Sequence, residues 1–135
     1  MATFNFDLVS PEKLLFSGQV DQVDVPGSEG DFGVFAGHAP FVTTVRPGIL
    51  TIYREGAGLK IVVDGGFAEV NPEGLTVLAD MAVALEDFDR EVLTGQIKDI
   101  EEDAADAKDP WQRDKLTHKL DQLKALQTAL GSQSH

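Results

Sequence analysis

Hydrophobic and polar residues alternate at the start of the chain. Phe4, Phe6 and Leu8 alternate with polar residues, which is the period of a strand buried on one face. Seven further short apolar segments follow, separated by turn residues such as Pro47-Gly48. The expected strands cover residues 3–8, 14–16, 23–25, 41–45, 49–53, 59–63, 67–70 and 75–78. Short strands with turn signals at this spacing predict a β-sandwich or barrel.

Glycines and prolines interrupt this pattern over residues 25–40, VPGSEGDFGVFAGHAP. Glycine permits sharp turns and close backbone approaches, so we expect an irregular loop held against a sheet. A phosphate-binding loop would need a lysine followed by a hydroxyl residue at the start of a helix. Here Glu29 and Asp31 would instead repel a phosphate. We interpret the segment as an acidic recognition loop.

The apolar period changes to that of a helix at Leu85. Asp87 is the expected N-cap of a first helix, with Asp89 in its first turn. A second helix is expected to begin after Asp109, its N-cap, and to end at Gly131. The two apolar stripes comprise Leu93, Ile97, Ile100, Ala104 and Ala107, then Leu116, Leu120, Leu123 and Leu130. The pattern predicts a β-domain over residues 1–85 and an antiparallel helical hairpin over residues 86–135.

The hairpin is expected to be a mobile appendage. Gly95 lowers helix stability by about 1 kcal/mol relative to alanine. Acidic residues also crowd the C-terminal end of the first helix, where negative charge is unfavourable. They are Asp99, Glu101, Glu102, Asp103 and Asp106.

Composition limits the classes of partner. The 135 residues include 23 acidic and 11 basic side chains, a formal net charge of −12, which argues against a nucleic-acid or anionic-membrane surface. The absence of cysteine excludes disulfides, thiolate nucleophiles and zinc–thiolate sites. No leader pattern or long apolar run is present, so we expect no direct membrane insertion and, in a bacterium, a cytosolic protein.

Histidine and serine give little indication of chemistry. His38, His118 and His135 have no second ligand type at metal-binding spacing, and no serine lies in a nucleophile-elbow pattern. We therefore expect no metal and no catalytic residues. His38 has two readings, as a turn histidine bonded to nearby backbone or as a partner contact.

Two features of the helical region also have two readings each. Asp87 and Asp89 could bind a cation, but acids at a helix start usually cap it. Trp111 is interpreted as a hydrophobic staple against the first helix or the sheet, with a partner-binding anchor as the alternative.

Several ordered motifs together resemble the epsilon subunit of F-type ATP synthases. The likeness covers residues 4 to about 90, and the two-helix tail fits the remainder. No single motif would be specific, but the ordered combination is. The motifs are GSEG at 27–30, GV at 33–34, GHAP at 37–40, PG at 47–48, GGFAEV at 65–70 and VLAD at 77–80.

The resemblance implies a ten-stranded β-sandwich followed by a C-terminal helical hairpin, at the foot of the central stalk of the synthase. It implies a non-catalytic role in which the sandwich binds the gamma subunit and rests on the polar loops of the membrane c-ring. By position, Glu29, Gly30 and Asp31 correspond to the segment facing the c-ring, and His38 and Thr43 to the face turned toward gamma. It also implies a peripheral location at the cytoplasmic face of the bacterial inner membrane.

The resemblance also bears on regulation. The family's hairpin can extend, contact the alpha and beta subunits and inhibit ATP hydrolysis, and some members bind ATP at the start of the first helix. The matching residues here keep Asp89, followed by Arg90, but Val92 stands where arginine is expected. A triphosphate thereby loses its main charge partner, so we expect no nucleotide cofactor. In the family the second helix offers basic residues to the alpha and beta subunits, and here it has a surplus of only two positive charges, so we expect only weak inhibition. The charged residues of that helix are Arg113, Lys115, Lys119 and Lys124 against Asp114 and Asp121.

The sequence leaves two rival functions open. One is an ATP-sensing nucleotide-binding module, for which Asp89 and Arg90 would form the site and Val92 is the discriminating residue. The other is an unrelated hydrolase on a β-sandwich, which would need His38 clustered with an acid and a nucleophile.

Overall fold

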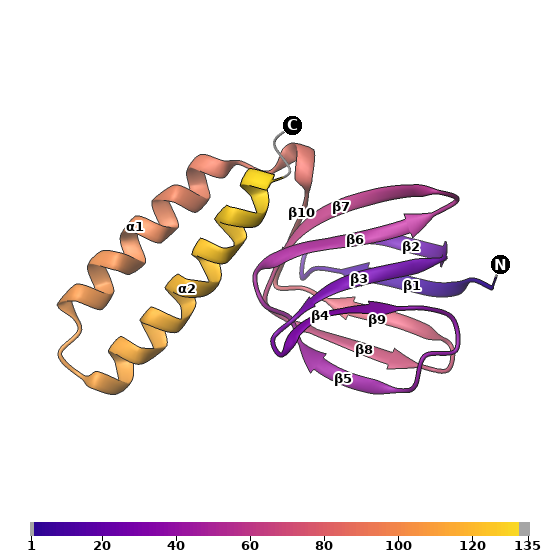
Figure 1. The fold of residues 1–135 in the computed structure, drawn as a ribbon, viewed down its shortest axis with the longest axis horizontal. Helices are drawn as coiled ribbons and strands as arrows, with labels where there is room; N and C mark the ends of the chain where they lie inside the picture. Colours follow the sequence, from indigo (N-terminus) through magenta and orange to yellow (C-terminus); the bar gives the residue numbers. More distant parts are fainter. Residues whose placement is uncertain (1, 133–135) are drawn as a thin grey trace. The chain divides into compact units, whose positions relative to one another are not determined.

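A computed structural model describes residues 2–132. These residues form two compact units whose boundary lies between Asp87 and Phe88. The first unit is built from ten strands in two sheets, and the second contains two α-helices (Figure 1). Both the sandwich and the hairpin expected from the sequence are therefore confirmed.

Each sheet of the sandwich has five strands. One has the order β2-β1-β9-β8-β5 and the other β10-β7-β6-β3-β4. Every pairing is antiparallel except β1 with β9, which run parallel from Asn5↔Gly74 to Val9↔Leu78. The strands are β1 (Phe4–Val9), β2 (Leu14–Val20), β3 (Gln22–Gly27), β4 (Gly30–Val34), β5 (Phe41–Thr44), β6 (Gly48–Arg54), β7 (Ala57–Asp64), β8 (Phe67–Asn71), β9 (Gly74–Leu78) and β10 (Met81–Ala84).

The core lies between the two sheets and is formed by alternate residues of each strand. Phe6 and Leu8 of β1 are fully buried, as the alternation predicts. The opposite sheet contributes Leu50 and Ile52 of β6 to the same cluster. Because one face of each sheet fills this core, the other face is left to meet solvent or a partner.

The pattern of apolar residues did not predict two of the strands. Residues 25–40 are not wholly irregular, because β4 pairs with β3 from Gly27↔Gly30 to Val23↔Val34. Backbone pairing is possible for glycine-rich sequence, so the glycines did not prevent a hairpin here. The strand β10 also follows β9, where the series was expected to close, and pairs with β7 at Ala84↔Ile61.

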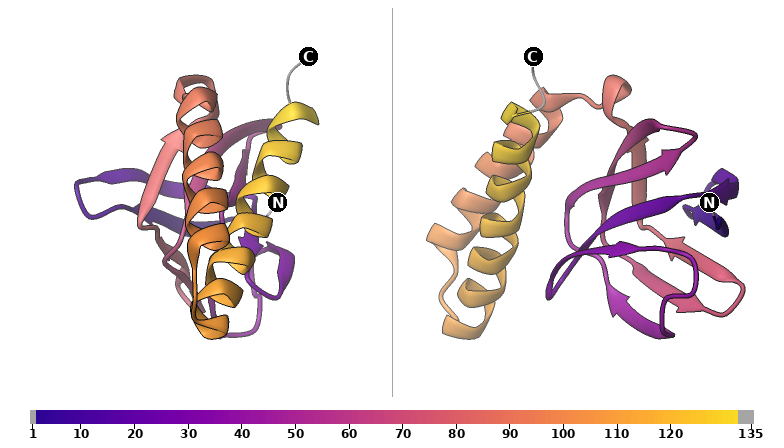
Figure 2. Two further views of the ribbon diagram at one scale, coloured as in Figure 1. Left: turned by 90° about the vertical axis from the view of Figure 1, so that its left-hand side faces the viewer. Right: turned by 45° about the vertical axis from the view of Figure 1, so that its right-hand side comes forward.

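The second unit is an antiparallel pair of helices. A 3₁₀ turn, η1 (Leu85–Asp87), ends the sandwich unit, and α1 (Arg90–Asp106) and α2 (Pro110–Ser132) follow. Figure 2 shows the two helices side by side. Leu93 and Ile97 of α1 are buried, and the buried residues of α2 are Leu123, Leu126 and Leu130.

Three expectations about the hairpin were wrong. The N-cap of α1 is Asp89, not Asp87, and its carboxylate accepts a hydrogen bond from the Glu91 N–H at 2.9 Å. Gly131 does not end α2, which continues to Ser132. Trp111 is not a staple, because it is 70% exposed, with the Lys115 ammonium 5.8 Å from the centre of its ring.

No helix among the described residues is long and apolar enough to cross a membrane.

Candidate partner-binding site

The acidic loop of the sequence is a tight turn between β3 and β4. Gly27 pairs with Gly30, which leaves Ser28 and Glu29 at the tip. Gly27 is required by close approach, since a Cβ there would lie 2.8 Å from the Gly30 carbonyl oxygen and 2.9 Å from the Phe32 ring. We call residues 27–31 the acidic turn.

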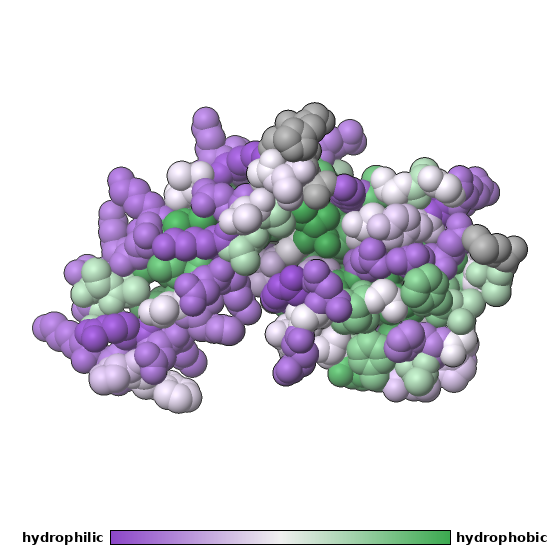
Figure 3. Space-filling model, viewed as in Figure 1, coloured by the Kyte–Doolittle hydropathy of each residue, from purple (hydrophilic) through white to green (hydrophobic). Residues whose placement is uncertain are grey.

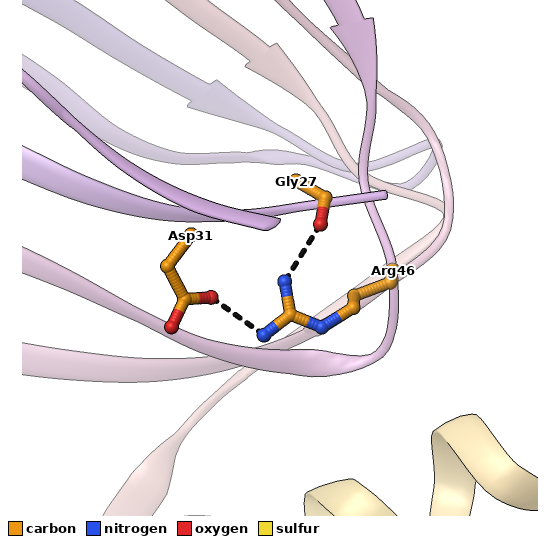
Figure 4. A network of polar contacts seen from close by, with 3 residues as sticks. All are labelled: Gly27, Asp31 and Arg46. Carbon is orange, nitrogen blue, oxygen red and sulfur yellow. Dashed lines mark hydrogen bonds and ion pairs between the residues drawn. The ribbon is translucent and has the colours of Figure 1, made fainter. Parts of the chain in front are cut away.

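Arg46 holds one side of the acidic turn (Figure 4). Its Nη1 donates to the Gly27 carbonyl oxygen at 2.6 Å, and its Nη2 donates to Asp31 Oδ1 at 2.5 Å. The Arg46 backbone N–H also donates to the Pro26 carbonyl at 2.9 Å. One guanidinium therefore bridges the two strands on either side of the tip, a geometry for which arginine is suited.

Ser28 ties the same turn to the other sheet. Its backbone N–H donates to the Thr44 carbonyl at 2.9 Å, and the two hydroxyl oxygens lie 2.5 Å apart. Gly27 also forms an isolated bridge with Val45. The turn extends from the sheet of β3 and β4 but is anchored to β5 of the opposite sheet, so it is fixed relative to the whole sandwich.

Glu29 and Asp31 differ in whether their carboxylates are paired. It is exposed at the tip of the turn, and its carboxylate has no hydrogen bond or ion pair with any residue in the described range 2–132. Asp31 is also exposed, at 75% of its side chain, but it is paired with Arg46. Gly30 lies between them with φ of +131°.

The two residues assigned to the gamma-facing side lie at and before β5. His38 is half-buried, its Nδ1 is 2.9 Å from the Ala39 carbonyl oxygen, and its ring centre is 5.3 Å from that of Phe41. Thr43 is half-buried and pairs with Ala68, a core residue, so it lies on the inward side of β5. The outward-facing neighbours of Thr43 are Val42 and Thr44.

His38 lines a surface pocket of about 320 Å³. The other lining residues are mostly apolar and include Phe4, Phe35 and Pro72. No serine, cysteine or carboxylate is among the described residues that line it, so the cluster that a hydrolase would need is not formed around His38.

The outer face of the β2-β1-β9-β8-β5 sheet carries a row of apolar side chains that the sequence reading missed. The register places Phe67 of β8 beside Leu78 of β9, Leu78 beside Val9 of β1, and Val9 beside Leu14 of β2. Leu14 is 59% exposed and Phe67 42%. We call these four residues the apolar row. Their phase in the alternation, opposite to that of the core residues, was the signal that could have revealed them.

Figure 3 shows, on the face it presents, hydrophobic residues gathered over the part of the sandwich where β4, β5 and β8 lie. Val42, on the outward side of β5, is exposed and faces the same side of the sheet as the apolar row. An aligned set of exposed apolar residues on one sheet face is typical of a protein interface.

The candidate nucleotide residues lie at the start of α1 and are both engaged within the hairpin. Asp89 caps the helix, and Arg90 Nη1 donates to the Leu130 carbonyl oxygen at 3.0 Å. Val92 is exposed. The residues are brought close together, but their polar groups already bind the hairpin itself.

Metal ligands do not gather in the described part of the chain. No group of three or more His, Cys, Asp or Glu side chains within residues 2–132 is placed to hold a metal ion. The Nε2 atom of His118 lies 3.3 Å from Nε2 of Gln122. His135 lies outside the described residues.

Comparison with known proteins identifies the family of this chain. A family model described as the ATP synthase delta/epsilon chain, β-sandwich domain, matches residues 3–85. The ATP synthase epsilon chain 1 of Nitrobacter hamburgensis is 55% identical, over 98% of this chain and 97% of the relative. The epsilon chain of Parvibaculum lavamentivorans is 57% identical, over 90% and 93%.

A solved structure agrees with the sequence relatives. A chain in the mitochondrial ATP synthase of Euglena gracilis, determined as an OSCP/F1/c-ring assembly, is 28% identical, with a TM-score of 0.79 over 96% of this chain and 82% of that one. The family model covers more than half of this chain, and the bacterial relatives match it nearly end to end. The chain therefore belongs to the delta/epsilon chain family of ATP synthases and is an epsilon-type subunit of the F-type enzyme.

Proposed function

We propose that this chain is a non-catalytic rotor subunit of the central stalk, joining the gamma subunit to the c-ring so that ion translocation is coupled to ATP synthesis. The observation that carries the proposal is that one rigid sandwich bears two different surfaces, the apolar row and the acidic turn. A subunit that transmits torque needs two attachment points on a body that does not deform between them.

The gamma subunit is the proposed partner of the apolar row and of the adjoining strand β5. His38 and Thr43 lie at or next to that strand, with Val42 exposed between them. Burying exposed apolar side chains such as Phe67 and Leu14 against a partner is favourable by about 25 cal/mol per Å². The row thus supplies a hydrophobic centre to the interface.

The polar loops of the c-ring are the proposed partner of the acidic turn, through Glu29, Gly30 and Asp31. An acidic tip suits a basic loop, and the ties to Arg46 and Thr44 hold the tip in one conformation. A preorganised turn loses little conformational entropy on binding. This partner would place the chain peripherally at the cytoplasmic face of a bacterial inner membrane.

The hairpin is proposed to regulate ATP hydrolysis only weakly, through the alpha and beta subunits. Part of its positive charge is used internally, since Lys124 lies 3.4 Å from Glu101 and Arg113 donates to the Ala107 carbonyl at 2.7 Å. Deleting residues 88–135 should therefore raise ATP hydrolysis by the assembled enzyme only slightly. A large rise would contradict weak inhibition.

No nucleotide cofactor is proposed. Arg90 is bonded to Leu130, and Val92 offers no charge to a phosphate. Calorimetry with ATP should show no binding at sub-millimolar concentration. A clear titration would favour the ATP-sensing alternative.

Capture of the gamma subunit by the isolated full-length chain tests the central proposal. Phe67→Asp should reduce capture by at least tenfold, because a charge in the apolar row would be buried unpaired in the complex. Leu59→Asp is the matched control, since Leu59 is similarly exposed but lies on β7 of the other sheet. Failure of the wild-type chain to bind gamma would refute the proposed function. Equal losses of capture in both variants would refute the apolar row as the gamma-binding surface.

A further inference from the structure

We propose that Arg46 is a positioning residue for the acidic turn and that Glu29, rather than Asp31, is the carboxylate that meets the cationic surface of the c-ring. This inference rests on the proposed function and assigns separate tasks to the two acids. It depends on which of them is already paired.

The charge of Asp31 is offset by Arg46, a side chain of the same sandwich. Its Oδ1 lies 2.5 Å from Arg46 Nη2, and the other arm of the same guanidinium donates to the Gly27 carbonyl (Figure 4). Opposite charges at this separation act on a more distant partner as a dipole, whose field falls off faster than that of a single charge. Asp31 therefore contributes little attraction toward a basic loop while the pair is intact.

The charge of Glu29 is not offset by an ion pair with any residue in the range 2–132. Its neighbour Ser28 is fixed to Thr44 by both backbone and side chain, and Gly27 is fixed by Arg46. The tip is thus anchored immediately before Glu29 and again at Asp31, two residues later. The anchoring determines where the Glu29 carboxylate is presented, and no described side chain competes for it.

Replacement of Arg46 separates this arrangement from a simple charge effect. Arg46→Gln adds one unit of negative charge to the turn and releases Asp31. If the acids acted only through their summed charge, the variant would bind a cationic loop more tightly. If Arg46 positions the turn, the variant would bind less tightly in spite of its greater negative charge.

The experiment uses the full-length chain in complex with gamma and measures binding to the detergent-solubilised c-ring, at low and high salt. Glu29→Gln should weaken binding by up to about fivefold at low salt, the usual size of an exposed charge pair, and by less at high salt. Arg46→Gln should weaken binding at least as much at both salt concentrations. Arg46→Lys should recover part of the loss, because one ammonium cannot bridge both groups in the way that the guanidinium does.

Hydrogen exchange at the Ser28 amide gives a second readout. It should rise in Arg46→Gln and stay unchanged in Glu29→Gln, since only the former loosens the turn. Tighter binding by Arg46→Gln, or wild-type binding by Glu29→Gln, would overturn this inference while the wild-type chain still bound. Absence of c-ring binding by the wild-type complex would instead refute the proposed function.

Discussion

Replacement of Gly66 by alanine tests the closest backbone approach in the sandwich. Gly66 joins β7 of one sheet to β8 of the other, with φ of +93°, and its carbonyl accepts a hydrogen bond from the Val45 N–H at 2.9 Å. A Cβ at this position would lie only 1.8 Å from the Leu78 carbonyl oxygen and 2.9 Å from the Ala79 Cα. Both neighbours are backbone atoms, so the overlap can be relieved only by moving the backbone, either at position 66 or at the end of β9.

The expected loss has two parts. A left-handed conformation in a residue with a Cβ costs about 1–2 kcal/mol, and forced overpacking against fixed atoms adds about 1–3 kcal/mol. Gly66→Ala should therefore lower the free energy of unfolding of the sandwich by about 2–5 kcal/mol, a large part of the 5–15 kcal/mol typical of a domain.

Gly56→Ala is the matched control. Gly56 has a similar φ of +81°, but a Cβ there would meet no atom within 4 Å. Its loss should be about 1 kcal/mol, because the strain remains and the reduced entropy of the unfolded chain offsets part of it. Urea unfolding followed by the amide NMR signals of β-strand residues separates the sandwich from the hairpin. Equal midpoints for the two variants would refute the close approach at Gly66.

Three further changes test other parts of the chain. Gly95→Ala should stabilise the hairpin by about 1 kcal/mol, since Gly95 lies in the interior of α1 with open space around it; an unchanged urea midpoint of the helical circular dichroism signal would contradict this. The hydrogen bond to Asp24 and the charge of that carboxylate raise the pKa of Tyr53 above that of an isolated tyrosine. Tyr53 is the single tyrosine, so absorbance near 295 nm should report a lower pKa in Asp24→Asn, and an unchanged titration would count against the bond. Trp111→Ala should change the stability of the hairpin by no more than about 0.5 kcal/mol, as substitutions at exposed positions usually do. A larger loss of stability in thermal unfolding would indicate that Trp111 packs as a hydrophobic staple.

The alternation of apolar residues was enough to predict most of the sandwich because burial on one face is a local signal. Phe6 and Leu8 could be assigned to the core without any knowledge of their partners. The strand β4 could not, because Gly30 and Gly33 have no side chains to alternate and their pairing with β3 is visible only in the fold. The four residues of β10, Met-Ala-Val-Ala, are all half-buried, so they lack the contrast that marks a strand.

The site was predictable only in part, since sequence position gives no information on which polar groups pair. Glu29 and Asp31 looked equivalent, and the ion pair to Arg46 that distinguishes them spans fifteen residues of chain. Thr43 was named from resemblance, whereas the strand phase turns it inward and exposes Val42. The N-cap of α1 was misplaced by two residues because Asp87 and Asp89 are chemically identical candidates.

The parallel pairing of β1 with β9 determines when the sandwich can form on the ribosome. β1 is an interior strand of its sheet, and its second neighbour is absent until residues 74–78 have been made. Until then β1 has one hairpin partner and an open edge, so the nascent chain is held in an unfinished state that favours binding by chaperones. Once β10 has left the exit tunnel, every strand of both sheets is available, while α1 and α2, which follow it in the chain, have yet to emerge. The sandwich can therefore close before the helical hairpin leaves the exit tunnel.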